Sequence, residues 1–445
     1  MLTISINKKF VNEKKHVLDF VFNEVFGREY QLTTDEEKSY RISKNNKTLV
    51  IPDEFFLNFD DGFPYYKNPE FIPSNIEFTD YPEFDLLNIP VIYGKSGIKY
   101  DGEKTYLNND IFAGIFFMLT RWEEVAISKF DSHSRFVEEE NLSVKFDFYS
   151  KPVVNEYIEL IEKLLLKLGI LETVKIRDYQ LFITHDIDDY ARYDSFLKFL
   201  KALGGDIIKR KSIKTFANTI KDYFGIIFRN KKDIYDRFDF LMDLSEEKNV
   251  KSRFYFIPGH KGEYDVRFDI RSKRLAKTIE NIKARNHIVG IHPSYSSFCN
   301  QHQLKKEKER LSQHVSDIIE GRQHYLRFKT PDTWQDWDDL NIKFDSSIGF
   351  YARTGFRAGI CFEYPVFNVV SRKQLKLRER PLIVMDTALR AECKTKEKSL
   401  ERFAQHAELV KKYKGDFVLL WHNSNLSVNE WKDWDKVYKQ IIEKL

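Results

Sequence analysis

Three acidic residues follow directly after a short apolar run near the middle of the chain. Residues 181–184 form this run, and His185, Asp186, Asp188 and Asp189 come after it. In an extended strand Asp186 and Asp188 would point to the same side, so that two carboxylates converge on one site. Such a pair suits proton transfer or the binding of a divalent metal ion. The alternative is an Asp-rich turn that caps the following helix, because Asp is a common N-cap residue.

The elements that must position these side chains are predicted by short apolar runs that alternate with helical stretches after residue 178. This alternation is typical of a parallel-stranded α/β fold. The candidate strands are residues 181–184, 253–257, 288–291, 325–328, 382–384 and 417–421. Each ends near a residue that can do chemistry, and in the same order these are Asp186, His260, His292, Arg327, Asp386 and His422. A series of this kind at one end of successive strands predicts the active face of a barrel enzyme.

The order and type of these groups resemble the polysaccharide deacetylase family, the NodB-type carbohydrate esterases. The resemblance covers about residues 178–445 and implies a distorted (β/α) barrel that carries five short motifs. The first family motif is Thr-Phe-Asp-Asp, and the chain reads Thr-His-Asp-Ile-Asp from residue 184, which implies that Asp186 is the catalytic base and Asp188 a metal ligand. The second motif is a His-x-x-x-His ligand pair. Here His292 is present, and Ser296 stands in place of the second histidine.

The three remaining motifs imply the other members of the site. An Arg-x-Pro motif followed by an aromatic residue is loosely matched from residue 327 to residue 334, so that Arg327 or Lys329 would hold the base carboxylate. Asp345 resembles the aspartate that orients the acid histidine in the fourth motif. The fifth motif, Leu-x-x-His, is matched at residues 419–422 and makes His422 the general acid.

The third metal ligand is left open among Ser296, His260 and His324. Serine is a poor zinc ligand beside imidazole. His260 is expected to end a strand at the right face. His324 lies three residues before Arg327, so the two side chains would point to opposite faces of a strand unless a bulge intervenes.

These residues predict a metal-dependent hydrolase that removes N-acetyl groups, or as a second choice O-acetyl groups, from a carbohydrate. A bound zinc, cobalt or nickel ion could lower the pKa of water from 15.7 to about 7 and stabilise the oxyanion. Aromatic residues near the motifs, Tyr295, Trp334 and Trp421, are expected to bind the sugar. Because Ser296 replaces a ligand, a sugar-binding pseudoenzyme of the same fold is the main alternative. A metal-free glycosidase that uses Asp186 and a second carboxylate is a third hypothesis.

Composition excludes several other classes of protein. The 445 residues carry a net charge of only +4, which gives no indication of nucleic-acid binding. The three cysteines, Cys299, Cys361 and Cys393, form no close pair, which fits a reducing compartment and excludes a cysteine-cluster zinc site. The N-terminus lacks the apolar core of a secretory signal, and the apolar run at residues 111–119 is too short to cross a bilayer. We therefore predict a cytoplasmic protein of bacterial type.

Residues 1–150 are predicted to form a smaller α/β or α+β accessory domain. Helical periodicity is expected at residues 16–26 and 109–126, and a clean amphipathic helix at residues 151–168 lies within a linking segment, 151–177. The stretch from residue 109 to residue 135 also resembles the N-terminal region that is often joined to such deacetylase domains. No residue here has the spacing of metal ligands or of a catalytic nucleophile.

An insertion at about residues 194–232 separates the first two predicted strands. It contains ten Lys or Arg residues against three Asp, interleaved with many Phe, Ile and Leu residues. A basic helix pair with an apolar face can lie on an anionic membrane, which would suit a lipid-linked glycan substrate. A lid, or packing against the N-terminal domain, is the alternative role.

Overall fold

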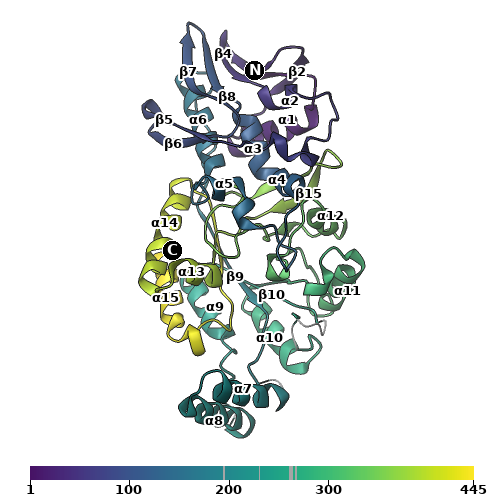
Figure 1. Ribbon diagram of the computed structural model, residues 1–445, viewed down its shortest axis with the longest axis vertical. Helices are drawn as coiled ribbons and strands as arrows, with labels where there is room; N and C mark the ends of the chain where they lie inside the picture. The colour runs from purple at the N-terminus through teal and green to yellow at the C-terminus, as the bar shows by residue number, and fades with distance from the viewer. Residues whose placement is uncertain (194–195, 230, 260–263, 266–267) are drawn as a thin grey trace. The chain divides into compact units, whose positions relative to one another are not determined.

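The computed structural model describes residues 1–193, 196–229, 231–259, 264–265 and 268–445 (Figure 1). The chain forms two compact units, each assembled from three segments. The first unit contains residues 1–180, 325–384 and 405–417, and the second contains residues 181–324, 385–404 and 418–445. Each predicted domain, 1–150 and 178–445, is a single continuous segment of the sequence, whereas each of these units combines three separate segments.

The first unit contains a mixed sheet with the strand order β2-β1-β3-β4-β8-β7. Tyr40 and Ile42 of β3 are buried and alternate with half-buried neighbours. They pair with Ile51 and Leu49 of β4, so one face of the sheet is a buried apolar layer. The bounds are β1 (Thr3–Asn7), β2 (Gln31–Asp35), β3 (Ser39–Lys44), β4 (Lys47–Pro52), β7 (Gly94–Asp101) and β8 (Lys104–Asn109). A separate hairpin pairs β5 (Glu77–Tyr81) with β6 (Leu86–Val91).

Helices of the first unit follow the predicted periodicity with two interruptions. The helix predicted at residues 16–26 is α1 (Val11–Leu18) continued by a π-helical turn, Asp19–Val25. The helix predicted at residues 109–126 is split into α3 (Ile111–Thr120) and α4 (Trp122–Ile127), because Arg121 has φ of 53°. The helix predicted at residues 151–168 is confirmed as α6 (Val153–Lys167).

The remaining elements of the first unit come partly from residues 54–145 and partly from residues 325–384. They include short helices and an antiparallel strand pair, β14 with β15. The bounds are α2 (Glu54–Leu57), α5 (Leu142–Lys145), α12 (Asp332–Asp339), β13 (Phe344–Asp345), β14 (Tyr364–Asn368) and β15 (Lys373–Glu379).

The second unit contains strands in the order β12-β11-β10-β9-β17-β16, of which β9 to β12 pair in parallel. The register pairs Asp186 of β9 with Tyr255 of β10, and Ile291 of β11 with Gly321 of β12. The bounds are β9 (Gln180–Ile187), β10 (Ser252–Phe256), β11 (Ile288–Ile291), β12 (Glu320–Gly321), β16 (Val384–Met385) and β17 (Asp416–Leu420). Because β9 to β12 are parallel, their carboxyl ends lie at one edge, and the predicted α/β class is confirmed.

Helices connect these strands, as expected for parallel pairs, and a last helix, α15, follows the final strand. They are α9 (Phe238–Glu247), α10 (Lys273–Ala284), α11 (Gln301–Leu311), α13 (Asp386–Cys393), α14 (Lys396–Lys412) and α15 (Trp434–Lys444). The insertion forms two further helices, α7 (Phe196–Ile208) and α8 (Ile213–Arg229), at the bottom of Figure 1. Within the part of the chain that is described, no helix has the length and apolarity needed to cross a membrane.

One predicted strand is wrong. Residues 325–328 do not extend a strand, because the chain leaves β12 after Gly321 and enters a 3₁₀ turn at His324–Leu326. Tyr325 and Leu326 both have positive φ angles, 60° and 51°, and two consecutive left-handed residues interrupt an extended strand. This difference decides which residues reach the site.

Candidate metal centre

Strand β9 delivers the two aspartates on which the prediction rests. Asp186 is buried within the strand, and Asp188 follows its last residue, Ile187, with a side chain that is 35% exposed. His185 points the other way: its Nδ1 lies 2.7 Å from the carbonyl oxygen of Trp421, and burial lowers its pKa to about 4. The alternation predicted from the sequence therefore places Asp186 and Asp188 together, and the structure shows in addition that His185 lies in the core.

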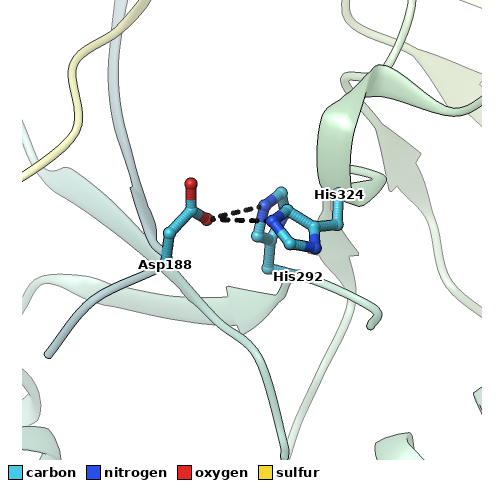
Figure 2. Close-up of side chains that lie close together, drawn as sticks. All are labelled: Asp188, His292 and His324. Atoms are coloured by element: carbon cyan, nitrogen blue, oxygen red, sulfur yellow. Dashed lines mark ion pairs between the residues drawn. The ribbon is translucent and has the colours of Figure 1, made fainter. Parts of the chain in front are cut away.

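Two histidines converge on Asp188 (Figure 2). His292 follows the end of β11 and places Nε2 3.3 Å from Asp188 Oδ1. His324, three residues beyond β12, places Nε2 3.6 Å from the same oxygen. The potential ligand atoms of the three residues all lie within 4.8 Å of one another.

The surroundings of these side chains fit a metal ion. His292 Nδ1 lies 2.6 Å from the carbonyl oxygen of Arg322, so this nitrogen donates a hydrogen bond and leaves the Nε2 lone pair directed at Asp188. Asp188 Oδ1 is buried, and among the residues that the structure describes it accepts no hydrogen bond of good geometry. One carboxylate and two imidazoles form a common zinc donor set, whose donor atoms in a tetrahedral site are roughly 3.4 Å apart.

Electrostatics couple the three groups. Burial alone would raise the pKa of Asp188, but the neighbouring His324 and His292 hold it below the usual range. Burial would lower the pKa of His292, yet Asp186 and Asp188 raise it above 6.5. Without a metal ion, protons would therefore hold this cluster together, and a metal ion would compete with them.

The arginine that contacts Asp186 is Arg322. Its Nη1 donates to Asp186 Oδ1 at 2.9 Å and to Thr184 Oγ1 at 3.0 Å. The expectation of Arg327 or Lys329 is corrected: Arg327 Nε donates to the carbonyl oxygen of His133 at 2.7 Å, and Lys329 forms an exposed ion pair with Asp332. Arg322 and His324 come directly after β12, two positions apart.

The carboxylate that contacts His422 is Asp386. His422 Nδ1 lies 2.8 Å from Asp386 Oδ1, and the His422 backbone N–H donates to Oδ2 at 2.9 Å. Burial opposes the charged imidazole, but Asp386 and Asp188 raise the pKa of His422 to about 10. His422 Nε2 lies 3.6 Å from Asp188 Oδ2.

The expectation that Asp345 orients His422 is corrected in the same way. Asp345 accepts a hydrogen bond from Ser347 Oγ at 2.5 Å and raises the pKa of the buried Glu379, after the larger effect of burial.

The predicted sugar-binding aromatic residues divide into two groups. Trp334 and Trp421 are fully buried, and their indole N–H groups donate to Glu379 and to the carbonyl oxygen of Asn425, so both serve the core and that expectation is corrected. Tyr295 is half-buried, and its ring lies 4.7 Å from that of Tyr264, which is 42% exposed. Tyr295 therefore stays a candidate for contact with a sugar.

Among the three candidates for the third metal ligand, the structure places His324 beside Asp188 and His292. Ser296 is exposed, and its hydroxyl lies 3.1 Å from that of Ser294. His260 lies outside the described residues. His324 reaches Asp188 because the short strand β12 removes the alternation argument that had counted against it. The pattern Arg-x-His at residues 322–324 was the only signal in the sequence.

Parts of this chain are similar to a family model and to a solved structure. A family model described as "Family of unknown function (DUF7033)" matches residues 2–169. No curated protein matches the chain. The chain is similar to a solved structure titled "Crystal structure of putative polysaccharide deacetylase from Mycobacterium smegmatis", with 14% sequence identity and a TM-score of 0.37. The match covers 60% of this chain and 84% of the chain in that structure.

Proposed function

We propose that the protein is a metal-dependent hydrolase that removes an N-acetyl group from a carbohydrate, with an O-acetyl group as the second choice. The observation that carries this proposal is the convergence of Asp188, His292 and His324 beside an arginine-bound aspartate and an aspartate-bound histidine. The distorted barrel expected from the sequence belongs to the same proposal.

The divalent ion would be held by Asp188 Oδ1 and by Nε2 of His292 and His324. When bound, such an ion supplies a Lewis acid that polarises a carbonyl oxygen and lowers the pKa of water. Zinc fits the donor set, and cobalt or nickel could replace it.

Asp186 is positioned to act as the general base. Arg322 fixes one of its oxygens, Oδ1, and thereby leaves Oδ2 facing the ligand cluster, 3.8 Å from His292 Nε2. A carboxylate oriented in this way can accept a proton from an attacking water molecule.

His422 is positioned to act as the general acid. Asp386 holds its Nδ1–H and raises its pKa to about 10, so Nε2 carries a proton at neutral pH on the side that faces Asp188. The expulsion of an amine requires such a proton, since an amide anion is a poor leaving group.

Contact with the sugar is proposed for Tyr295 and its neighbour Tyr264. Aromatic rings bind the apolar faces of sugar rings, and Tyr264 is sufficiently exposed to do so. Asp265, next to Tyr264, accepts a hydrogen bond from the backbone N–H of Tyr295 and lies 3.8 Å from His324 Nδ1, so the pair adjoins the metal cluster.

The experiment that tests the proposal measures metal content and acetate release together. Protein reconstituted with zinc, cobalt or nickel is expected to hold about one ion per chain and to release acetate from N-acetylated oligosaccharides. Metal binding with glycan binding but without acetate release would favour the pseudoenzyme. Absence of metal from all three preparations would reject the proposal.

Two pairs of variants separate the roles. Asp186→Asn should retain metal and lose about 10²–10⁴-fold in rate, because only the proton acceptor is removed. Asp188→Asn should lower metal affinity itself. His324→Ala should also lower metal affinity, whereas Ser296→Ala, the matched control, should leave it unchanged. Equal metal affinity in His324→Ala and the wild type would refute the assignment of the third ligand.

A further inference from the structure

The insertion forms a helical hairpin, α7–α8, whose apolar side chains are divided between two sides. Phe199 of α7 stacks on Tyr223 of α8 with ring centroids 3.9 Å apart, and Asp206 accepts a hydrogen bond from Thr219 between the helices. These contacts use the inner faces of both helices and hold the hairpin together.

The outer faces are also apolar, although they are exposed. On α7 the exposed apolar residues recur at helical spacing and form one stripe: Phe196, Leu197, Leu200, Ile207 and Ile208, which are 46–78% exposed. On α8 a second stripe contains Ile213, Phe224, Ile227 and Phe228, which are 48–88% exposed. Isolated exposed apolar residues are common, but a contiguous set of this size usually marks a contact surface.

The charge of the hairpin is strongly one-sided. Residues 196–229 contain eight Lys or Arg and two Asp, a net charge of +6, while the whole chain carries +4, so the rest of the chain is net negative. Asp206 is buried and Asp222 half-buried, and within the described residues of the hairpin no Asp or Glu is exposed. Lys201, Lys221 and Arg229 are exposed and flank the two stripes.

Apolar and basic side chains meet at the tip of the hairpin, where α7 ends and α8 begins. Ile208 and Ile213 are 75% and 88% exposed, and the exposed Lys209, Lys211 and Lys214 lie beside them. This combination complements an anionic phospholipid surface, where apolar side chains enter the acyl boundary and cations contact the headgroups. A purely apolar partner would give no role to the cations, and an acidic soluble partner would give none to the isoleucines.

We propose that the α7–α8 hairpin docks the protein on an anionic phospholipid membrane, with the tip around Ile208 and Ile213 inserted into the bilayer surface. This docking does not depend on the reaction at the metal centre. It would bring the second unit to substrates that are themselves attached to lipid.

The test is sedimentation of the full-length protein with vesicles. Vesicles of phosphatidylcholine mixed with phosphatidylglycerol should bind the protein, vesicles of phosphatidylcholine alone should bind it at least about tenfold less, and rising salt should weaken binding, because charge attraction is screened beyond about 8 Å at physiological ionic strength. Absence of binding to anionic vesicles at low salt, or equal binding to both kinds of vesicle, would overturn the proposal.

Variants with a matched control assign the binding to the hairpin. Ile208→Asp with Ile213→Asp should abolish binding, and Lys211→Glu with Lys214→Glu should weaken it about tenfold or more. Ile176→Asp, at a 77% exposed isoleucine outside the hairpin, and Lys104→Glu should leave it unchanged. Because all of these positions are exposed, each variant should unfold at the same temperature as the wild-type protein. A wild-type dimer that the Ile208→Asp and Ile213→Asp pair dissolves, without vesicle binding, would instead show that a second copy of the chain covers this surface.

Discussion

At the scale of single residues, the site depends on two charged partners that hold the reacting groups. Arg322 binds one oxygen of Asp186, and Asp386 binds Nδ1 of His422, so each reacting group keeps one free atom directed at the ligand cluster. Both partners are buried, where a hydrogen bond to a charged group contributes more than it does in water.

The first prediction separates Asp386 from Asp345. Asp386→Asn should lower the pKa of His422 in the metal-free protein from its value of about 10, because the favourable carboxylate charge is removed while burial still opposes the imidazolium. The rate of the proposed deacetylation should fall by up to about 10²–10⁴-fold. NMR titration of the His422 ring measures the pKa directly.

Asp345→Asn is the matched control for this prediction. Asp345 contacts Ser347 and lies beside Glu379, so its replacement should leave the titration of His422 unchanged, even if stability falls. A shift of the His422 pKa in Asp345→Asn but not in Asp386→Asn would restore the assignment expected from the sequence.

At the scale of elements, β12 determines whether the site can form. This strand has only two residues, yet the residues that follow it supply Arg322 and His324. Its approach to β11 is very close: a Cβ atom on Gly321 would lie 2.0 Å from the carbonyl oxygen of Ile291. Only glycine permits this approach, and Arg322 N–H donates to the same oxygen at 3.1 Å.

The second prediction follows from that close contact. Gly321→Ala should push β12 away from β11, lower the free energy of unfolding by about 1–3 kcal/mol and weaken metal binding, because Arg322 and His324 move with the strand. Urea denaturation and metal titration measure the two effects. Gly204→Ala in α7, where a Cβ atom would meet nothing within 4 Å, should be neutral or stabilising by up to about 1 kcal/mol. Wild-type metal affinity in Gly321→Ala would show that the position of β12 does not control the site.

At the scale of the whole molecule, each compact unit contains a buried histidine with a low pKa. Burial lowers the pKa of His16 in the first unit and of His185 in the second from 6.5 to about 4. Between pH 6.5 and about pH 4 these histidines bind protons in the unfolded chain but not in the folded chain. Their full contribution to the free energy of unfolding is therefore present above pH 6.5, and it is lost progressively as the pH falls toward 4.

The third prediction is this acid-dependent loss of stability. Each histidine should contribute up to about 3 kcal/mol to the decrease, from about 1.4 kcal/mol per unit of pKa. Urea denaturation across this pH range should show a shallower slope for His16→Gln, and His302→Gln, at an exposed histidine, should retain the wild-type slope. Identical slopes for His16→Gln and the wild type would mean that His16 is accessible to protons in the folded state.

The part of the site that the sequence by itself determined is local. Alternation along β9 placed Asp186 and Asp188 on one side, and the ends of two predicted strands placed His292 and His422. These inferences need only the geometry of an extended chain and the rule that parallel strands end at one edge. The α/β class and the helix at α6 followed from periodicity in the same way.

Tertiary structure alone decided the partners of these groups. His324 instead of Ser296, Arg322 instead of Arg327 and Asp386 instead of Asp345 depend on where β12 ends and on which loops approach β9. A strand of two residues is too short to show an alternating pattern in the sequence. The burial of Trp334 and Trp421 depends on neighbours that are far away in the chain. Hydrogen-bond partners and burial are set by packing between distant segments, which local spacing does not encode.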